Sequence, residues 1–151
     1  MSETDHGYDP TGENTVFKDW HLSPFKDGYV NMVGPYYFKN DELGQPMSGF
    51  KAEARHLNGG GSVHGGCLLS LADTALFVIS MSSLKGDGAV TMQLDAKFLS
   101  PGRVGDVIIA TGKVTRAGAS VIFAEGELKS GERILLTFTG ILKRIKARIT
   151  P

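Results

Sequence analysis

Residues 54–84 read A-R-H-L-N-G-G-G-S-V-H-G-G-C-L-L-S-L-A-D-T-A-L-F-V-I-S-M-S-S-L, and this stretch decides the fold. Its first part is dense in glycine, and after Gly66 the chain runs without glycine or proline as far as Gly86. This pattern predicts a loop that leads into one long helix. Apolar residues fall on almost every face of that helix, which is typical of a helix buried in a core.

Two features of this helix predict a site. Asp73 places an acid in the middle of the apolar run, and a buried carboxylate is costly unless it is paired or serves chemistry. At the helix start, Gly65 and Gly66 have no side chains, so we expect their N–H groups to lie open at the positive end of the helix dipole. Such an end can bind an anion or a developing oxyanion.

Composition narrows the class of protein. The chain has 151 residues, 41% of them hydrophobic, which suits one domain with one core. Sixteen basic and sixteen acidic side chains cancel, so no net charge favours nucleic acid or an anionic membrane. The single cysteine, Cys67, fits a reducing compartment. We see no signal peptide and no apolar run near the ~20 residues of a membrane span, and we expect a cytoplasmic protein.

The segments outside the central stretch predict a small α+β domain. We expect residues 1–28 to form a polar tail with a short packing segment at 15–22, and residues 29–151 to form the folded domain. Extended structure, as two short strands broken at Gly34-Pro35, is expected over residues 29–39, and a strand over 50–54.

Four further strands are expected after the helix, at residues 89–99, 106–116, 120–129 and 133–145. Short connections, each containing glycine, separate them, so we expect antiparallel hairpins throughout. In the first of these strands, apolar and polar residues alternate from Val90 to Phe98, which predicts one buried face. The result is one antiparallel sheet packed against one helix.

Two motifs add a family resemblance. The spacing Asn58-x5-His64-Gly65-Gly66-x6-Asp73 resembles that of the PaaI-type acyl-CoA thioesterases, and T-M-Q-L-D-A-K-F-L-S-P at residues 91–101 resembles a strand of the same family. The order of elements resembles the hotdog fold, in which a curved antiparallel sheet wraps around one long central helix. The likeness covers residues 30–145.

The resemblance implies thioester hydrolysis. Gly65 matches the position whose N–H polarises the thioester carbonyl, and Asp73 matches the general base or nucleophile. Asn58 and His64 match orienting polar residues, although this chain has Asn-Gly-Gly-Gly where Asn-Pro-x-Gly is common. Thr91 matches a Ser or Thr near the attacking water.

Coenzyme A is part of the substrate in this family, so no separate cofactor is implied. Gly66, Arg103 and Arg116 are the candidates for contacts with the coenzyme A portion. The four histidines have no metal-ligand spacing, and we expect no metal site.

Plainer roles stay open for most of these residues. Asp73 could be satisfied across a subunit interface, His64 could simply cap the helix start, Asn58 could cap its loop, and Thr91 could be an ordinary strand residue. Cys67 reads better as a small buried thiol than as a nucleophile, because no partner such as a Cys-His pair is visible around it.

Alternative functions also stay open. A hotdog hydratase or dehydratase of acyl thioesters is one, although its His-Phe-Pro-Gly pattern is missing, and a module that binds acyl-CoA without cleaving it is another. Aromatic, short and medium acyl groups all fit the sequence. Gly65 and Asp73 are ~12 Å apart along one helix, so we expect a homodimer that shares its active sites, as hotdog dimers do, and that can pair again into a tetramer.

Overall fold

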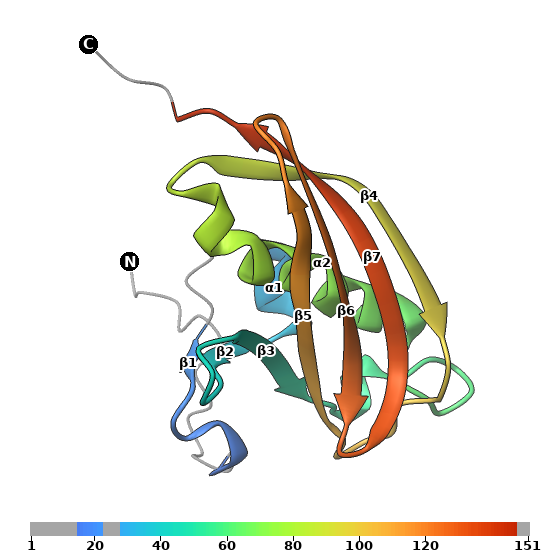
Figure 1. The fold of residues 1–151 in the computed structure, drawn as a ribbon. Helices are drawn as coiled ribbons and strands as arrows, with labels where there is room; N and C mark the ends of the chain where they lie inside the picture. Colours follow the sequence, from blue (N-terminus) through green and yellow to red (C-terminus); the bar gives the residue numbers. More distant parts are fainter. Residues whose placement is uncertain (1–14, 23–27, 148–151) are drawn as a thin grey trace, which may run out of the picture.

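The computed structural model describes residues 15–22 and 28–147, and it has one sheet curled around one long helix. The helix, α2, spans Gly65–Leu84 and lies in the hollow of a seven-stranded antiparallel sheet (Figure 1). This is the hotdog architecture expected from the sequence. The helix begins at the predicted glycines and ends before Gly86, so the central prediction is confirmed.

Short elements precede α2 and longer strands follow it. The earlier elements are the 3-10 turn Thr15–Phe17, β1 (His21–Leu22), α1 (Gly28–Val33), β2 (Tyr37–Asn40), β3 (Pro46–Lys51) and the 3-10 turn Ala54–His56. The later strands are β4 (Gly88–Phe98), β5 (Val107–Ala117), β6 (Val121–Ser130) and β7 (Arg133–Ile145). The strand order in the sheet is β1-β2-β3-β5-β6-β7-β4.

The strand order corrects one expected hairpin. β5, β6 and β7 are joined in sequence by hairpins, but β4 pairs with β7 and not with β5. The chain between β4 and β5 is longer than a tight hairpin turn and crosses the end of the sheet, where the Gly102 carbonyl accepts from the Val63 N–H at 2.9 Å. This crossing leaves β4 as an edge strand.

The core lies between α2 and the concave face of the sheet. Leu71 and Leu76 of α2 are fully buried, as are Ile108 of β5 and Leu142 of β7. The sheet approaches the helix closely at Gly112, where an added Cβ would lie 2.6 Å from the Ile79 side chain. A glycine at this point therefore allows α2 to pack tightly on the sheet.

One face of α2 is not covered by the sheet. Leu69, Asp73 and Phe77 are only half-buried, and Met81 is 45% exposed. They follow one another at four-residue intervals and so share one helix face. The expectation of burial all round is thus wrong for this face, because a single sheet can cover only part of a helix.

By length and composition, α2 could span a membrane, contrary to our expectation that no segment would. It has 20 residues with a mean hydropathy of 1.7 over its most apolar window. However, 61% of that window is buried inside the protein. The apolar character of α2 is therefore explained by its place in the core.

Helix α1 stands where extended structure was expected. Residues Gly28–Val33 form a helix, and Val30 is buried against the core cluster. Its last carbonyls bind side chains that come from residues more than twenty positions later in the chain. These distant contacts outweigh the local strand propensity of the valines and tyrosine. β3 likewise ends at Lys51, where we expected a strand to extend to residue 54.

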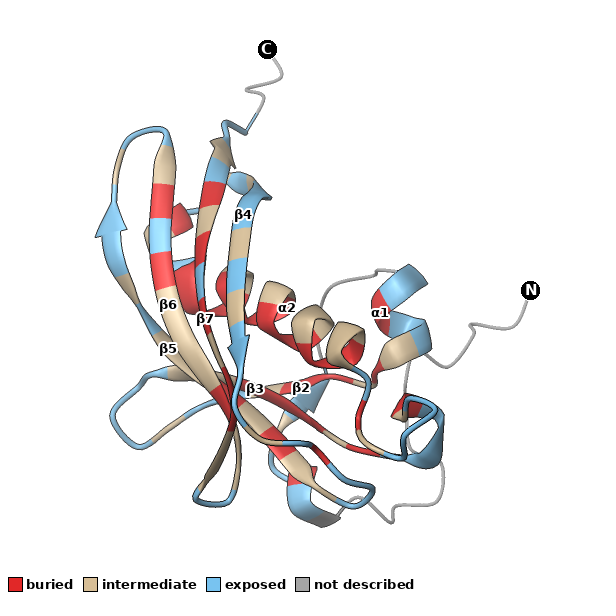
Figure 2. Ribbon diagram, turned by 90° about the vertical axis from the view of Figure 1, so that its right-hand side faces the viewer, coloured by how far each residue is buried: buried red, intermediate tan, exposed pale blue. Residues whose placement is uncertain are grey.

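Strand β4 is more exposed than its alternation predicted, and Figure 2 shows it pale blue along most of its length. Val90 is 50% exposed, Met92 60% and Phe98 53%. A β-bulge between Thr91 and Gln93 interrupts the pairing with β7. The expected buried face is therefore half uncovered, because β4 has no strand on its outer side and α2 contacts it only in part.

The first described segment packs on the outside of the sheet, as expected. Phe17 is buried and stacks on Tyr37, with ring centroids 4.5 Å apart, and β1 pairs with β2. The expected tail at residues 1–14 lies outside the described residues.

Candidate active site

The start of α2 has one open N–H group. The His64 ring caps the helix, because its Nδ1 accepts from the Gly66 N–H at 2.8 Å. The His64 carbonyl accepts from the Cys67 N–H at 2.9 Å. Among the described residues, the Gly65 N–H has no acceptor. Only Gly65 therefore keeps the open N–H that we expected of both glycines, and Gly66 is occupied by the cap.

Asn58 organises the glycine-rich loop before the helix. Its side-chain oxygen accepts from the N–H groups of Gly60 at 2.9 Å and Ser62 at 3.2 Å. The Asn58 N–H in turn donates to the Ser62 carbonyl at 2.8 Å, which closes the loop. This geometry matches the loop-cap role that stayed open for Asn58.

Asp73 and Thr91 meet, although they are eighteen residues apart in the chain. The Thr91 hydroxyl donates to Oδ1 of Asp73 at 2.7 Å. Asp73 is half-buried on the uncovered face of α2, and Thr91 lies on β4 beside the bulge. The hydrogen bond fixes the carboxylate in one orientation and leaves its second oxygen available. The two sequence-predicted residues therefore form one unit.

The structure does not bring this unit to Gly65 within one chain. Eight residues of continuous helix separate Gly65 from Asp73, which is ~12 Å along the axis. No hydrogen bond joins the described residues of the helix start to Asp73 or Thr91. One chain thus holds the two halves of the predicted site at different places.

Two cavities lie along the same side of α2. The first, of about 460 Å³, contains Asp73 and extends towards the end of the helix, between α1 and the start of β4. The second, of about 310 Å³, lies at the helix start and is lined by residues that include His64, Gly66 and Met32. Helix α1 contributes to both cavities, through Val30 to the first and through Tyr29, Met32 and Val33 to the second.

A larger hollow lies elsewhere. It has about 840 Å³ and is lined mainly by polar residues of β4 to β7, without any residue of α2. None of the sequence-predicted site residues lines it. The predicted site residues therefore do not lie in this larger hollow.

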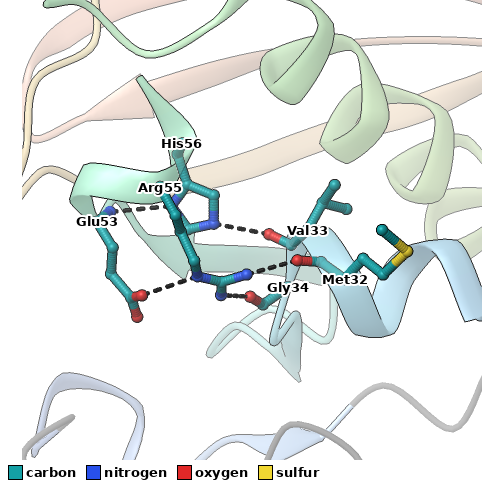
Figure 3. A network of polar contacts seen from close by, with 6 residues as sticks. All are labelled: Met32, Val33, Gly34, Glu53, Arg55 and His56. Atoms are coloured by element: carbon teal, nitrogen blue, oxygen red, sulfur yellow. Dashed lines mark hydrogen bonds and ion pairs between the residues drawn. The ribbon is translucent and has the colours of Figure 1, made fainter. Parts of the chain in front are cut away.

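Sequence reasoning missed a polar network that holds α1 against the loop before α2 (Figure 3). The Arg55 guanidinium donates to the carbonyls of Met32 and Gly34 and pairs with Glu53 at 2.9 Å. Cationic donors at a helix C-terminus satisfy carbonyls that have no partner in the helix. Met32 and Gly34 lie more than twenty positions before Arg55 in the sequence, so no local sequence pattern predicts these two contacts.

His56 completes the network and connects it to the helix start. Its Nδ1 accepts from the Glu53 N–H at 2.9 Å, so the proton lies on Nε2, which donates to the Val33 carbonyl at 2.8 Å. Burial, helped by the charge of Arg55, lowers the pKa of the His56 ring. The His56 carbonyl accepts from the His64 N–H at 2.8 Å. One residue thus links α1 to the residue that caps α2.

Cys67 lines the cavity at the helix start, whereas Arg103 and Arg116 line neither cavity beside α2. Burial raises the pKa of the Cys67 thiol to about 11, which suits a packing residue and not a nucleophile. Arg103 and Arg116 are both exposed. Within the part of the chain that the structure describes, no three metal-binding side chains cluster.

Comparisons with known proteins agree with the fold. The thioesterase superfamily profile matches residues 60–137. The acyl-coenzyme A thioesterase PaaI of Escherichia coli is 38% identical over 98 residues, which are 64% of this chain and 69% of that protein. The solved structure of the E. coli PaaI protein superposes with a TM-score of 0.71 at 30% identity, covering 83% of this chain and 89% of that one.

A thioesterase structure from Streptococcus pneumoniae, solved with coenzyme A, has the same fold. Its TM-score is 0.67 at 24% identity, and the match covers 75% of this chain and 88% of that one. The helix, the wrapped sheet and the matched residues lead to one assignment. The chain belongs to the thioesterase superfamily, as a PaaI-type member with the hotdog fold.

Proposed function

We propose that this protein hydrolyses acyl-CoA thioesters to a free acid and coenzyme A. The observation that carries the proposal is the Asp73 carboxylate, which the Thr91 hydroxyl orients at 2.7 Å beside a cavity on the uncovered face of α2. The activity of the E. coli relative and the coenzyme A in the S. pneumoniae structure support the same substrate class.

The reaction needs a base and an oxyanion site. In our proposal, Asp73 removes a proton from water as the water oxygen attacks the thioester carbonyl carbon. The carbonyl oxygen becomes negative and is stabilised by the Gly65 N–H at the helix N-terminus. When the C–S bond breaks, the electron pair leaves with the sulfur, which takes up a proton to give free coenzyme A. Attack by Asp73 itself, through a mixed anhydride, is the alternative for the same residue.

We propose that each site uses two chains. A water held by Asp73 must attack within ~3 Å of a carbonyl whose oxygen lies on a Gly65 N–H, and one helix separates these groups by ~12 Å. Two α2 helices packed side by side and antiparallel would bring Asp73 of one chain to Gly65 of the other. The uncovered face of α2 and the apolar residues of edge strand β4 offer the surface for that contact.

A free-thiol assay on a panel of acyl-CoAs tests the proposed function. We expect the wild-type protein to release coenzyme A, and Asp73→Asn to lower turnover by at least ~100-fold while the melting temperature stays close to wild type. Release of thiol by Asp73→Asn at the wild-type rate would remove Asp73 from the mechanism. Tight acyl-CoA binding without any thiol release would favour a binding module.

A further inference from the structure

The size and lining of the cavity beside Asp73 indicate which acyl groups it can hold. Its volume of about 460 Å³ lies in the ~300–1,000 Å³ range of small-molecule sites. Its lining comes from the second half of α2, from Val30 of α1 and from the start of β4. Its apolar lining consists of Val30, Phe77, Met81, Leu84 and Ala89. Such a lining suits a hydrocarbon chain better than the polar arm of coenzyme A.

The length of the cavity follows from helix geometry. Asp73 and Met81 both line it, and eight residues of helix separate them, which is ~12 Å. An extended chain advances ~1.2 Å per bond, since a residue of three backbone bonds spans ~3.6 Å. The part of the cavity between Asp73 and Met81 therefore accommodates about ten bonds, the length of a medium acyl chain, and Leu84 and Asp87 line the cavity beyond it.

Two charged side chains line the cavity, and both are carboxylates. Asp73 lines one end, and Asp87 lines the other. Asp87 is held in place by Arg144, at 3.7 Å, and by the Ala147 N–H at 3.3 Å. No lysine, arginine or histidine is among the described residues that line the cavity. Arg144, which pairs with Asp87, does not line the cavity, so an acyl chain that ends in a carboxylate would meet the Asp87 carboxylate before any cation.

We infer that this cavity holds the acyl chain during the hydrolysis proposed above, on which the inference rests. It selects uncharged, straight acyl groups of about eight to ten carbons. Phe77 and Met81 line the path of the chain, and Asp87 at the far end rejects chains with a terminal carboxylate. Helix α1 supplies Val30 to the wall, so the segment that the Arg55 and His56 network holds is also part of the specificity pocket.

Met81→Trp tests the length limit. Met81 is 45% exposed, so the larger ring can be added without opening the core. We expect the ring to fill the far end of the cavity. The kcat/KM for octanoyl-CoA and decanoyl-CoA should then fall by roughly tenfold or more relative to that for butyryl-CoA. An equal fall for all three substrates would mean that the cavity holds the coenzyme A arm, and would overturn the inference.

Met32→Trp is the matched control. Met32 is also exposed and lines the other cavity, at the start of α2. We expect this variant to keep the wild-type order of chain lengths. A loss of long-chain activity in Met32→Trp, with none in Met81→Trp, would place the acyl chain in the other cavity. If the wild-type protein releases no thiol from any acyl-CoA, the proposed function itself fails, and that result is distinct from both of these.

Asp87→Asn tests the charge selection. The substrates are octanoyl-CoA and the eight-carbon thioester that ends in a carboxylate. We expect the wild-type protein to prefer octanoyl-CoA by roughly tenfold or more, and Asp87→Asn to reduce that ratio. Arg144 keeps its bonds to the carbonyls of Ser83 and Gly118 in the variant, so the local fold is retained. An equal rate on both substrates in the wild type, or an unchanged ratio in the variant, would overturn this part of the inference.

Discussion

At the scale of single residues, the hydrogen bond from Thr91 to Asp73 indicates a separate role for each side chain. Thr91 has one hydroxyl, and that hydroxyl donates to the carboxylate of Asp73. A hydroxyl that donates to Asp73 orients the carboxylate and leaves the second oxygen free to accept from water. In the mechanism we propose, Thr91 is therefore a positioning residue, and its contribution can be separated from that of Asp73.

Replacing Thr91 with valine should slow turnover without unfolding the protein. Hydrogen bonds to charged groups contribute ~1.5–3 kcal/mol, and each ~1.4 kcal/mol of barrier changes a rate tenfold, so we expect a loss of about 10- to 100-fold in kcat. Thr91→Ser keeps the hydroxyl and should recover most of the rate. Equal rates for the valine and serine variants would show that the hydroxyl does not act on the carboxylate.

His56 should make stability depend on pH. Burial lowers its pKa in the folded protein, whereas the unfolded chain has an ordinary pKa near ~6.5. The positive charge of Arg55 also lowers this pKa, whereas the hydrogen bond to the Val33 carbonyl and the negative charge of Glu53 raise it. A group with a lowered folded pKa stabilises the fold fully above its unfolded pKa and loses that contribution as the pH falls below it. Protonation also removes the acceptor that binds the Glu53 N–H.

We therefore expect the melting temperature to fall as the pH decreases from about 7.5 to about 5.5. His56→Gln can keep a donor for Val33 but does not titrate, so its melting temperature should change less over the same range. Thermal melts of both proteins across this range provide the measurement. Parallel curves for the two proteins would assign the pH dependence to other groups.

At the scale of elements, α1 depends on its contacts and not on its own propensity. It has six residues, too few for an isolated helix to be stable in water. Arg55 binds the carbonyl of Met32 in α1 and that of Gly34 just after the helix, His56 binds the carbonyl of Val33, and Val30 is buried. Because α1 forms a wall of the cavity beside Asp73, its anchoring bears on the site as well as on the fold.

Arg55→Met should weaken the attachment of α1 to the segment before α2, because it removes the hydrogen bonds to Met32 and Gly34. We expect a loss of at least about 1 kcal/mol, or roughly 2–4 °C in Tm, from the bonds to Met32 and Gly34. Amide hydrogen exchange should increase in α1 while that of α2 stays slow. Arg55→Lys retains the charge but lacks the forked donor, so it should rescue only in part. Unchanged exchange in α1 after Arg55→Met would show that packing alone holds the helix.

At the scale of the whole molecule, one chain leaves apolar residues of both the sheet and the helix α2 incompletely covered. The sheet ends at β4, whose outer edge has no partner strand, and Val90, Met92 and Phe98 are at least half exposed there. The helix leaves Leu69, Asp73, Phe77 and Met81 incompletely covered. A second copy that pairs at the β4 edge would cover apolar residues of both layers and would bring a second α2 beside the first.

Mixing two inactive variants tests the shared site. Asp73→Asn removes the base, and Gly65→Val adds a side chain at the open N–H, where even a Cβ would lie 3.3 Å from the Phe98 ring. A mixed dimer regains one site with both wild-type groups, so activity should return to about half of the wild-type value per mixed dimer. Sedimentation should show a dimer or a larger symmetric assembly. Confirmed subunit exchange without recovered activity, or an active monomer, would contradict the model.

The sequence by itself was enough to determine the elements that have strong local signals. The glycine-rich loop and the uninterrupted apolar run placed α2 to within a residue or two, and turn residues bounded β4 to β7 almost as well. Asp73 stood out because an acid in an otherwise apolar helix is costly if it is buried without a partner. These features depend on backbone preferences and periodicity, which act over a few residues.

Only the tertiary structure decided the rest. The pairing of β4 with β7, the helical form of α1, the capping of Gly66 by His64 and the bond from Thr91 to Asp73 do not follow from any single segment. For α1, the local preference was for a strand, and contacts with Arg55 and His56 overrode it. The physical reason is that strand order and side-chain contacts depend on which surfaces meet once the chain is compact, and segments distant in sequence contribute most of that free energy.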